Sequence, residues 1–321
     1  MKAHAKITAC LLLVCFATAA ADSYPSRPIK FITSSAPGGQ VDLRARAYAQ
    51  RLSESLGQPV VVENRPGASG MIAAEAVIKA TPDGYTILFG STQEVLFPAV
   101  LVASARYDPL RDFTPIVLAT TGYPLLMVHP SLGVKSLAEL VAVAKTRPGQ
   151  ISCGTAGHAS TNHMACAYFS KLAGISVVAV PYKGSAPALL DASTGQVHFV
   201  IGFLGESHSY IKSGKLVPLA VLGPTRLGEL PEVATTAELG YKSLEVQGWT
   251  CLMAPAGTPP EIVRRLNAEV IRIATRTELG QWLAKTGAIF VEYTPAAFGD
   301  FVRSQIEKWR TISRETGIRA E

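Results

Sequence analysis

The fold is decided by the stretch IKFITSSAPGGQVD, residues 29–42, in which a short apolar run passes through two glycines into a helical pattern. The run Ile29–Thr33 predicts a buried strand, and residues 42–56 show the spacing of an amphipathic helix. A helix that begins directly after a glycine loop directs its first backbone N–H groups at whatever lies in front of it. Because these groups and the helix dipole favour negative charge, the stretch predicts an anion-binding loop.

A second loop of the same kind, TAGHAST at residues 155–161, lies further along the chain. It follows the strand-like run 150–154 and leads into a helical pattern over 161–173. Two such loops facing each other across a cleft would bind a small ligand that carries carboxylates. Neither these loops nor a third at residues 64–70 contains GxxxxGK[ST] or GxGxxG, so the sequence does not favour nucleotide binding.

Short β-branched runs alternate with helical patterns along most of the chain, which predicts parallel sheets covered by helices on both faces. The predicted strands lie at 29–33, 60–64, 85–90, 124–129, 151–154, 176–181, 197–201 and 216–222. In such sheets ligands bind outside the carboxyl ends of the strands, where both glycine loops fall. The turn-rich segment 108–115 predicts a boundary, and residues 244–255 predict a return to the first block.

Residues 1–21 are predicted to be a secretory signal peptide, cleaved near Ala20 or Ala21. Two lysines precede the apolar run 7–16, which is too short to span a bilayer, and small residues follow it. The chain has 30 Lys and Arg against 24 Asp and Glu, without a basic run interleaved with aromatic residues. Nucleic acid is therefore not an expected partner.

Three cysteines lie beyond the predicted signal peptide, Cys153, Cys166 and Cys251. They permit one disulfide and a leftover thiol, or three buried thiols, and the sequence does not decide between these. The spacing of Cys153, His158, His163 and Cys166 raises a zinc alternative, but structural zinc sites use tighter pairs, so we expect no metal.

Ser160 and His163 raise the alternative that the protein is a secreted hydrolase. The set of cysteines and histidines raises the alternative that it is a metalloenzyme. No GxSxG elbow surrounds Ser160, so we expect Ser160 or Thr161 to cap a helix and lend a hydroxyl to an anion. A third alternative is a sensor that presents its ligand to a membrane kinase.

Further motifs resemble the Bug proteins, the periplasmic substrate-binding subunits of tripartite tricarboxylate transporters. They are YPSRPI at 24–29, APGG at 36–39 with Asp42, VVVENRPG at 60–67, PDGYT at 82–86, VPYKGSAP at 180–187 and APAGTP at 254–259. The resemblance covers essentially the whole mature chain. It implies a two-lobed, hinged α/β fold of the type II periplasmic-binding-protein (Venus flytrap) kind with mostly parallel sheets. It also implies a monomeric periplasmic receptor, not an enzyme, that uses no cofactor and delivers a small carboxylate to the membrane permease subunits.

The resemblance places residues 22–123 and 246–321 in lobe 1, with the C-terminal helices packing back, and residues 124–245 in lobe 2. The ligand is expected between the lobes, with the loop at 34–39 contacting one end and the loop at 155–161 binding a carboxylate. The predicted ligand-binding residues are Ser34, Ser35, Ala36, Pro37, Gly38, Gly39, Asp42, Thr92, Thr155, Gly157, His158, Ala159, Ser160, Thr161, His163, Tyr182, Gly202 and Phe203.

Three departures from the family pattern bear on the ligand. Ser35 stands where an aromatic residue usually precedes APGG, and His158 stands where a small or amide residue usually follows Ala-Gly. Gly202 stands where an aspartate often meets a ligand amine. With Phe203 beside it, this favours a mono- or dicarboxylate other than an amino acid, and an aromatic diacid such as terephthalate is one candidate. Glu94 could instead receive a cationic group, which keeps the ligand open.

Overall fold

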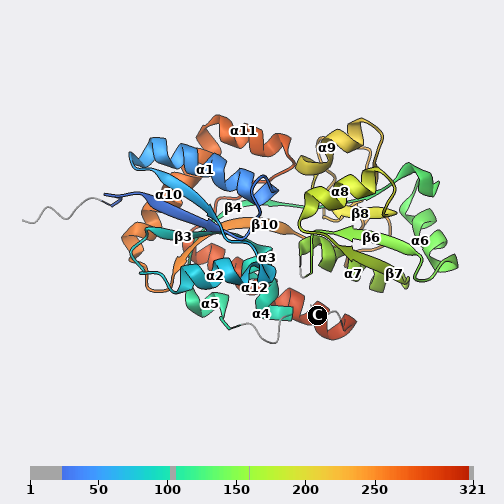
Figure 1. Cartoon of the computed structure of the whole chain (residues 1–321), viewed down its shortest axis with the longest axis horizontal. Coiled ribbons are helices and arrows are strands. Elements are labelled where there is room, and N and C mark those ends of the chain that lie inside the picture. The colour runs from blue at the N-terminus through green and yellow to red at the C-terminus, as the bar shows by residue number, and fades with distance from the viewer. Residues whose placement is uncertain (1–23, 102–105, 159, 318–321) are drawn as a thin grey trace, which may run out of the picture.

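The computed structural model describes residues 24–101, 106–158 and 160–317, which form two lobes side by side along the long axis of the molecule (Figure 1). The predicted signal peptide and Ala159 lie outside the described residues. No helix in the described ranges is both long and apolar enough to cross a membrane.

The elements follow one another in alternating order along the chain. They are β1 (Ile29–Thr33), α1 (Gln40–Leu56), β2 (Val60–Asn64), η1 (Ala68–Gly70), α2 (Met71–Ile78), β3 (Thr86–Ser91), α3 (Thr92–Val95), α4 (Phe97–Leu101), α5 (Pro109–Asp112), β4 (Phe113–Gly122), β5 (Leu125–Val128), η2 (Pro130–Leu132), α6 (Leu137–Thr146), β6 (Ile151–Thr155), α7 (Thr161–Ala173), β7 (Val177–Pro181), α8 (Ser185–Ser193), β8 (Phe199–Gly202), α9 (Leu204–Lys212), β9 (Val217–Val221), β10 (Gly248–Pro255), α10 (Pro260–Arg276), α11 (Glu278–Lys285) and α12 (Pro295–Thr316).

Each lobe is built on a five-stranded sheet. The strand order is β2-β1-β3-β10-β4 in one and β7-β6-β8-β5-β9 in the other. β10 is antiparallel to both of its neighbours and β5 to both of its own, so four of the five strands in each sheet run the same way. The predicted two-lobed α/β fold with mostly parallel sheets is confirmed.

The chain crosses between the two sheets twice, after β4 and before β10. The lobe limits expected at 123/124 and 245/246 fall within these crossings, and we keep them as a proposal. The carboxyl end of β3 faces the loop that follows β6, since Thr92, directly after β3, meets Thr161 at the start of α7.

Helix α1 shows why the opening stretch folds as it does. Its buried apolar residues, Ala45, Tyr48, Ala49 and Leu52, recur at helical spacing and pack against the sheet. The helix ends at Gly57, whose φ of 68° allows its N–H to bond the Ser53 carbonyl. The N-terminal end of α1 is thereby fixed at the carboxyl edge of the sheet.

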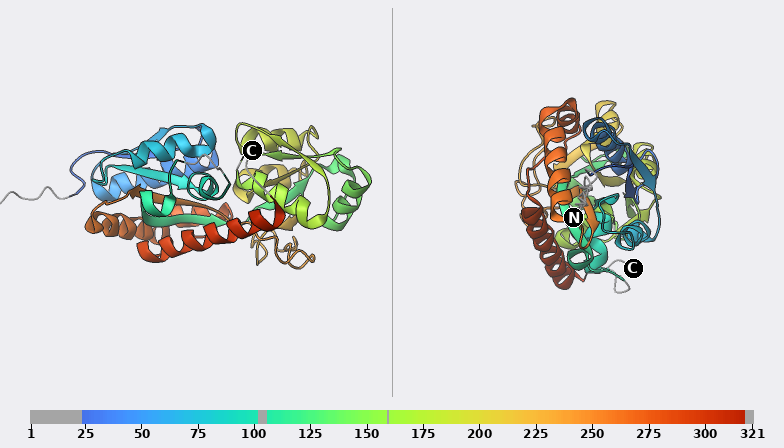
Figure 2. Two further views of the ribbon diagram at one scale, coloured as in Figure 1. Left: turned by 90° about the horizontal axis from the view of Figure 1, so that it is seen from below. Right: turned by 90° about the vertical axis from the view of Figure 1, so that its left-hand side faces the viewer.

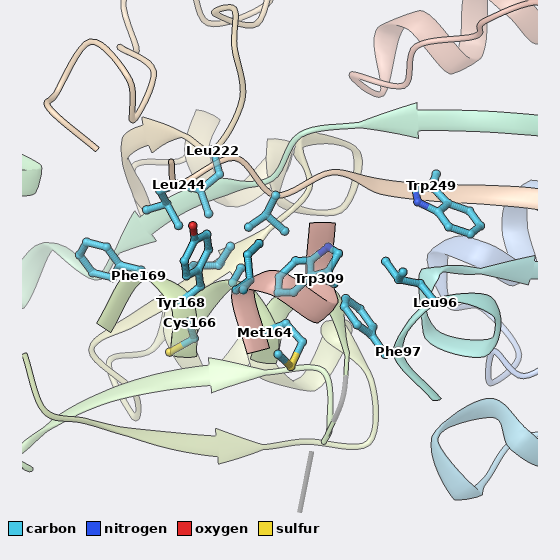
Figure 3. Close-up of a cluster of buried hydrophobic side chains, with 14 of the residues drawn as sticks. Leu96, Phe97, Met164, Cys166, Tyr168, Phe169, Leu222, Leu244, Trp249 and Trp309 are labelled. Carbon is cyan, nitrogen blue, oxygen red and sulfur yellow. The ribbon is translucent and has the colours of Figure 1, made fainter. Parts of the chain in front are cut away.

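Helix α12 joins the two lobes from one side, as the red helix in Figure 2 shows. Its Trp309 is 1% exposed, with the ring 5.2 Å from Phe97 of α4 and 6.2 Å from Tyr168 of α7 between ring centroids. These side chains belong to a single apolar cluster that contains residues of both lobes (Figure 3). The lobes therefore share a core on this side.

The segment 108–115, predicted to be only a turn-rich boundary, begins a strand. Asp108 caps the short α5, and β4 then starts at Phe113 and includes Pro115. β4 lies at the edge of its sheet, where it pairs with β10 and forms one further bridge, between Thr121 and Ile289. The register with β10 shifts opposite Pro115. An edge strand tolerates proline because one side of it needs no ladder hydrogen bonds, which is why the proline misled the prediction.

Candidate functional site

The predicted ligand-binding residues in the described ranges lie at or just after the carboxyl ends of β1, β3, β6, β7 and β8, or in the first turn of the following helix. Two contacts join these loops across the lobes. The hydroxyls of Thr92 and Thr161 lie 2.6 Å apart, and Ser69 Oγ donates to the His158 carbonyl at 3.4 Å. The structure therefore shows the two lobes closed on each other with the predicted loops between them.

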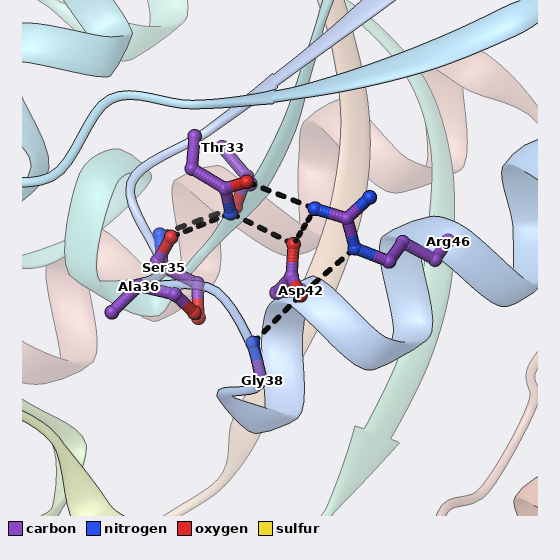
Figure 4. A network of polar contacts seen from close by, with 7 residues as sticks. Thr33, Ser35, Ala36, Gly38, Asp42 and Arg46 are labelled. Atoms are coloured by element: carbon purple, nitrogen blue, oxygen red, sulfur yellow. Dashed lines mark hydrogen bonds and ion pairs between the residues drawn. The ribbon is translucent and has the colours of Figure 1, made fainter.

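The first loop is held by Asp42 (Figure 4). The Asp42 carboxylate accepts from Gly38 N–H at 2.9 Å, from Arg46 at 3.0 Å and from Asn64 at 2.7 Å, and its side chain is 1% exposed. Burial alone would raise the pKa of Asp42, but these hydrogen bonds lower it below its ordinary value. Asp42 therefore fixes the shape of the loop, with its oxygens already occupied.

Gly39 is required by close packing inside the same loop. A Cβ on Gly39 would lie 2.5 Å from Ser35 Oγ and 3.1 Å from the Ala36 carbonyl. Gly39 is also the N-cap of α1 and supplies no side-chain acceptor, so the first N–H groups of the helix have no side-chain cap. The exposed positions Ala36, Pro37 and Gly38 leave this end of α1 accessible.

Glu94 does not offer a carboxylate to a cationic ligand group, which was one expectation. It is 1% exposed, and its oxygens accept from the hydroxyl of Ser34 and from both the N–H and the hydroxyl of Ser91. Burial raises the pKa of Glu94, and these hydrogen bonds partly offset the effect. Glu94 thus ties the loop after β1 to the loop after β3.

The second loop places Ser160 as the N-cap of α7, as predicted. Ser160 Oγ accepts from the His163 N–H at 3.2 Å and donates to the Gly157 carbonyl at 2.7 Å. Its proton is directed at a backbone carbonyl rather than at an imidazole base, so the geometry does not favour a nucleophilic serine. The exposed His158 lies with its ring centroid 5.5 Å from that of His163.

Two predicted side chains have their hydroxyls bonded within lobe 2. Thr155 is fully buried, with Oγ1 donating to the Val180 carbonyl at 3.4 Å. Tyr182 donates to Asp191 at 2.7 Å, and burial together with that carboxylate raises its pKa to about 12. Both hydroxyls are therefore already hydrogen-bonded to groups of lobe 2.

Gly202 lies next to a carboxylate that was not considered. Glu206 Oε1 is 3.6 Å from the position of a Cβ on Gly202, so an acid from α9 fills the space beside this strand end. Glu206 accepts from Ser185 Oγ and from the Phe203 N–H. The Phe203 ring lies against Gly248, where a Cβ would come within 2.2 Å of it, at the crossing between the lobes. An acid from α9 therefore lies beside this strand end, although residue 202 itself is a glycine, as the sequence shows.

Arg44 and Gln40 on α1 were also missed. Arg44 is 7% exposed and donates to Thr120 Oγ1 at 3.1 Å. Desolvation lowers its pKa to about 10, and the charge of Glu206 on the opposite lobe partly offsets this. The Gln40 Nε2 atom is buried without a hydrogen-bond partner among the described residues. Helical spacing could have found Arg44, because it lies four residues before the buried Tyr48.

The cysteines and histidines of the zinc alternative lie in different surroundings. Cys153 and Cys166 are buried together in the core of lobe 2, where burial and hydrogen bonding to Cys166 raise the pKa of Cys153. No group of three or more His, Cys, Asp or Glu in the described part of the chain is placed to hold a metal ion. In the described ranges Cys153, Cys166 and Cys251 are free thiols.

Two surface hollows lie away from the cleft. One is lined by α10, α11 and Arg51 of α1, and the other by α12 with Pro109, Leu110, Pro115 and Met253. None of the predicted ligand-binding residues lines either hollow, so the candidate site is assigned from the loops.

The fold and the two opposed loops define a two-lobed solute-binding protein. A family model described as "Tripartite tricarboxylate transporter family receptor" matches residues 44–318, and the chain belongs to this family. It is 36% identical to Protein BugT of Bordetella pertussis over 304 residues, which cover 94% of this chain and 93% of that protein.

Solved structures show the same fold at similar identity. An R. palustris protein solved with adipate superposes with a TM-score of 0.87 at 35% identity, covering 92% of this chain and 99% of that one. MatC from Rhodopseudomonas palustris with bound malate gives 0.85 at 29% identity, with 90% and 99% covered. The periplasmic binding protein BugD gives 0.85 at 30% identity, with 93% and 100% covered.

Proposed function

We propose that this chain is a periplasmic receptor that binds a small carboxylate between its lobes and delivers it to the membrane permease subunits of a tripartite tricarboxylate transporter. The observation that carries the proposal is the N-terminus of α1, which has no side-chain cap and is preceded by the exposed positions 36–38. Backbone N–H groups at such helix ends bind anions without a metal.

The relatives support a carboxylate as the ligand class, because two similar structures carry adipate and malate. We propose a mono- or dicarboxylate other than an amino acid, with terephthalate as one candidate. The presence of Glu206 beside Gly202 removes one reason for excluding amino acids. Its two oxygens, however, already accept hydrogen bonds from Ser185 and Phe203.

A thermal-shift screen tests this function, because a ligand that binds the folded state raises apparent stability by mass action. The screen would compare linear mono-, di- and tricarboxylates, terephthalate, aspartate and glutamate, with calorimetry on each hit. Stabilisation by one or more carboxylates is expected. Tight binding of aspartate or glutamate and of no other acid would contradict the proposed ligand class, and no response to any acid would contradict the function.

A further inference from the structure

Gln40 and Arg44 lie one turn apart on α1 and therefore share a helix face. Both side chains carry N–H donors, and only some of these donate hydrogen bonds to other described residues. The Arg44 guanidinium has five N–H groups, and among the described residues it donates a hydrogen bond to Thr120. Thr120 is positioned in turn by the Thr250 hydroxyl, 2.7 Å away.

The charge of Arg44 has no close counter-charge. No carboxylate oxygen of a described residue lies within 4.0 Å of its guanidinium, although Arg44 is only 7% exposed. Burying a cation without a paired anion is costly, and the cost falls when an anion binds beside it. The surroundings of Arg44 are therefore those of a site that an anion would complete.

Gln40 provides an independent observation. Its buried Nε2 has no acceptor among the described residues, and the residue stands at the first position of α1, next to Gly39. A buried amide donor is normally satisfied, so an unpaired one beside the exposed loop before α1 indicates a missing acceptor. The donor lies on the same helix face as Arg44.

Glu206 faces this position from lobe 2 but does not complete it. Its charge reaches Arg44 across the cleft, yet its oxygens accept from Ser185 and Phe203 and stay more than 4.0 Å from the guanidinium. The planar guanidinium binds carboxylates through two parallel N–H···O bonds. An acceptor with two oxygens, supplied by a ligand, fits the donors that remain.

We propose that Gln40 and Arg44 form a second acceptor subsite, which binds the second carboxylate of a dicarboxylate whose first carboxylate lies at the N-terminus of α7. The proposal rests on the carboxylate binding proposed above, and it commits the receptor to diacids. Arg44 is then a specificity-determining residue that distinguishes a diacid from a monoacid of the same length.

The test uses matched pairs of probes, namely terephthalate with benzoate, and linear diacids of about four to eight carbons with the monoacids of equal length. Calorimetry on the wild type should show a preference of about tenfold or more for the diacid of at least one pair. Arg44→Gln should reduce that preference to about twofold or less, mainly through lost diacid affinity. Arg44→Lys should retain part of the diacid preference, since lysine keeps the positive charge but lacks the two parallel N–H donors of the guanidinium. Gln40→Leu should weaken the diacid several-fold.

Arg51→Gln on the same helix is the matched control, because Arg51 is more exposed and paired with Glu54. It should leave the preference unchanged. Arg44→Gln should also leave the ligand-free melting temperature unchanged or higher, since it removes an unpaired buried charge. A lower melting temperature with an unchanged diacid preference would make Arg44 a structural tether and overturn the subsite. Wild-type binding of neither acid in any pair would instead contradict the proposed function.

Discussion

At the scale of single residues, the acids near the predicted site direct their oxygens at groups of the protein itself. Asp42 and Glu94 are each about 1% exposed, and the oxygens of each accept several hydrogen bonds from the loops around them. The sequence marked both acids as candidates for the site, but it did not show which groups their oxygens accept hydrogen bonds from. Sequence spacing does not show that Glu94 reaches back to Ser34, sixty positions earlier. That contact exists only once β1 and β3 are neighbours.

Glu94 gives a pH prediction, because burial raises its pKa above the ordinary 4.5. The folded protein then holds a proton that the unfolded chain releases above about pH 4.5. The stability that this group contributes is therefore full below the unfolded pKa and falls as pH rises through the folded pKa. Urea unfolding between about pH 4 and 8 should show the wild type losing stability relative to Glu94→Gln as pH rises.

The exposed Glu54→Gln on α1 is the control for this titration, and it should follow the wild-type curve. A wild type that gains stability relative to Glu94→Gln over the same pH range would contradict the raised pKa.

At the scale of elements, the sequence predicted those whose signals are local. β1, β2 and α7 lie within the predicted ranges because each has a regular apolar pattern with clear ends. The sequence-based prediction missed β4, because its proline is tolerated only at a sheet edge. It also missed α9 and α11, which are short. Missing α9 had a consequence for the site, because Glu206 was then not considered and Gly202 looked like the place of an absent acid.

The loop before α1 gives a prediction at this scale. Gly39→Ala would place a Cβ 2.5 Å from Ser35 Oγ but 3.9 Å from Ser35 Cβ. It should therefore destabilise the loop by about 1–3 kcal/mol and weaken carboxylate binding. Ser35→Ala in the same chain should restore part of both losses, since it removes the nearer oxygen and leaves the Ala36 carbonyl 3.1 Å from the new Cβ. Denaturant unfolding and calorimetry on the single and double variants measure this, and a double variant as impaired as Gly39→Ala would contradict the proposed clash.

At the scale of the whole molecule, the lobes are joined by more than the two segments that cross between them, after β4 and before β10. Trp309 of α12 packs between Phe97 and Tyr168, which belong to different lobes. The Thr92 and Thr161 hydroxyls join the lobes at the site itself. A helix at the end of the chain therefore contributes to the arrangement of loops far earlier in the sequence. The family resemblance placed the C-terminal helices against lobe 1, but nothing in it showed that one tryptophan would contact both lobes.

Trp309→Ala should remove a large buried side chain from a core that both lobes share, at a cost of about 3–5 kcal/mol. Because the Trp309 ring packs against side chains of both lobes, unfolding should also become less cooperative, with circular dichroism and tyrosine fluorescence giving separate midpoints. Trp282→Ala on α11 is the matched control, since that side chain is 40% exposed and should cost less than about 1 kcal/mol. Equal losses of stability in the two variants, or one sharp transition in Trp309→Ala with both probes, would show that α12 stabilises one lobe and does not couple the two.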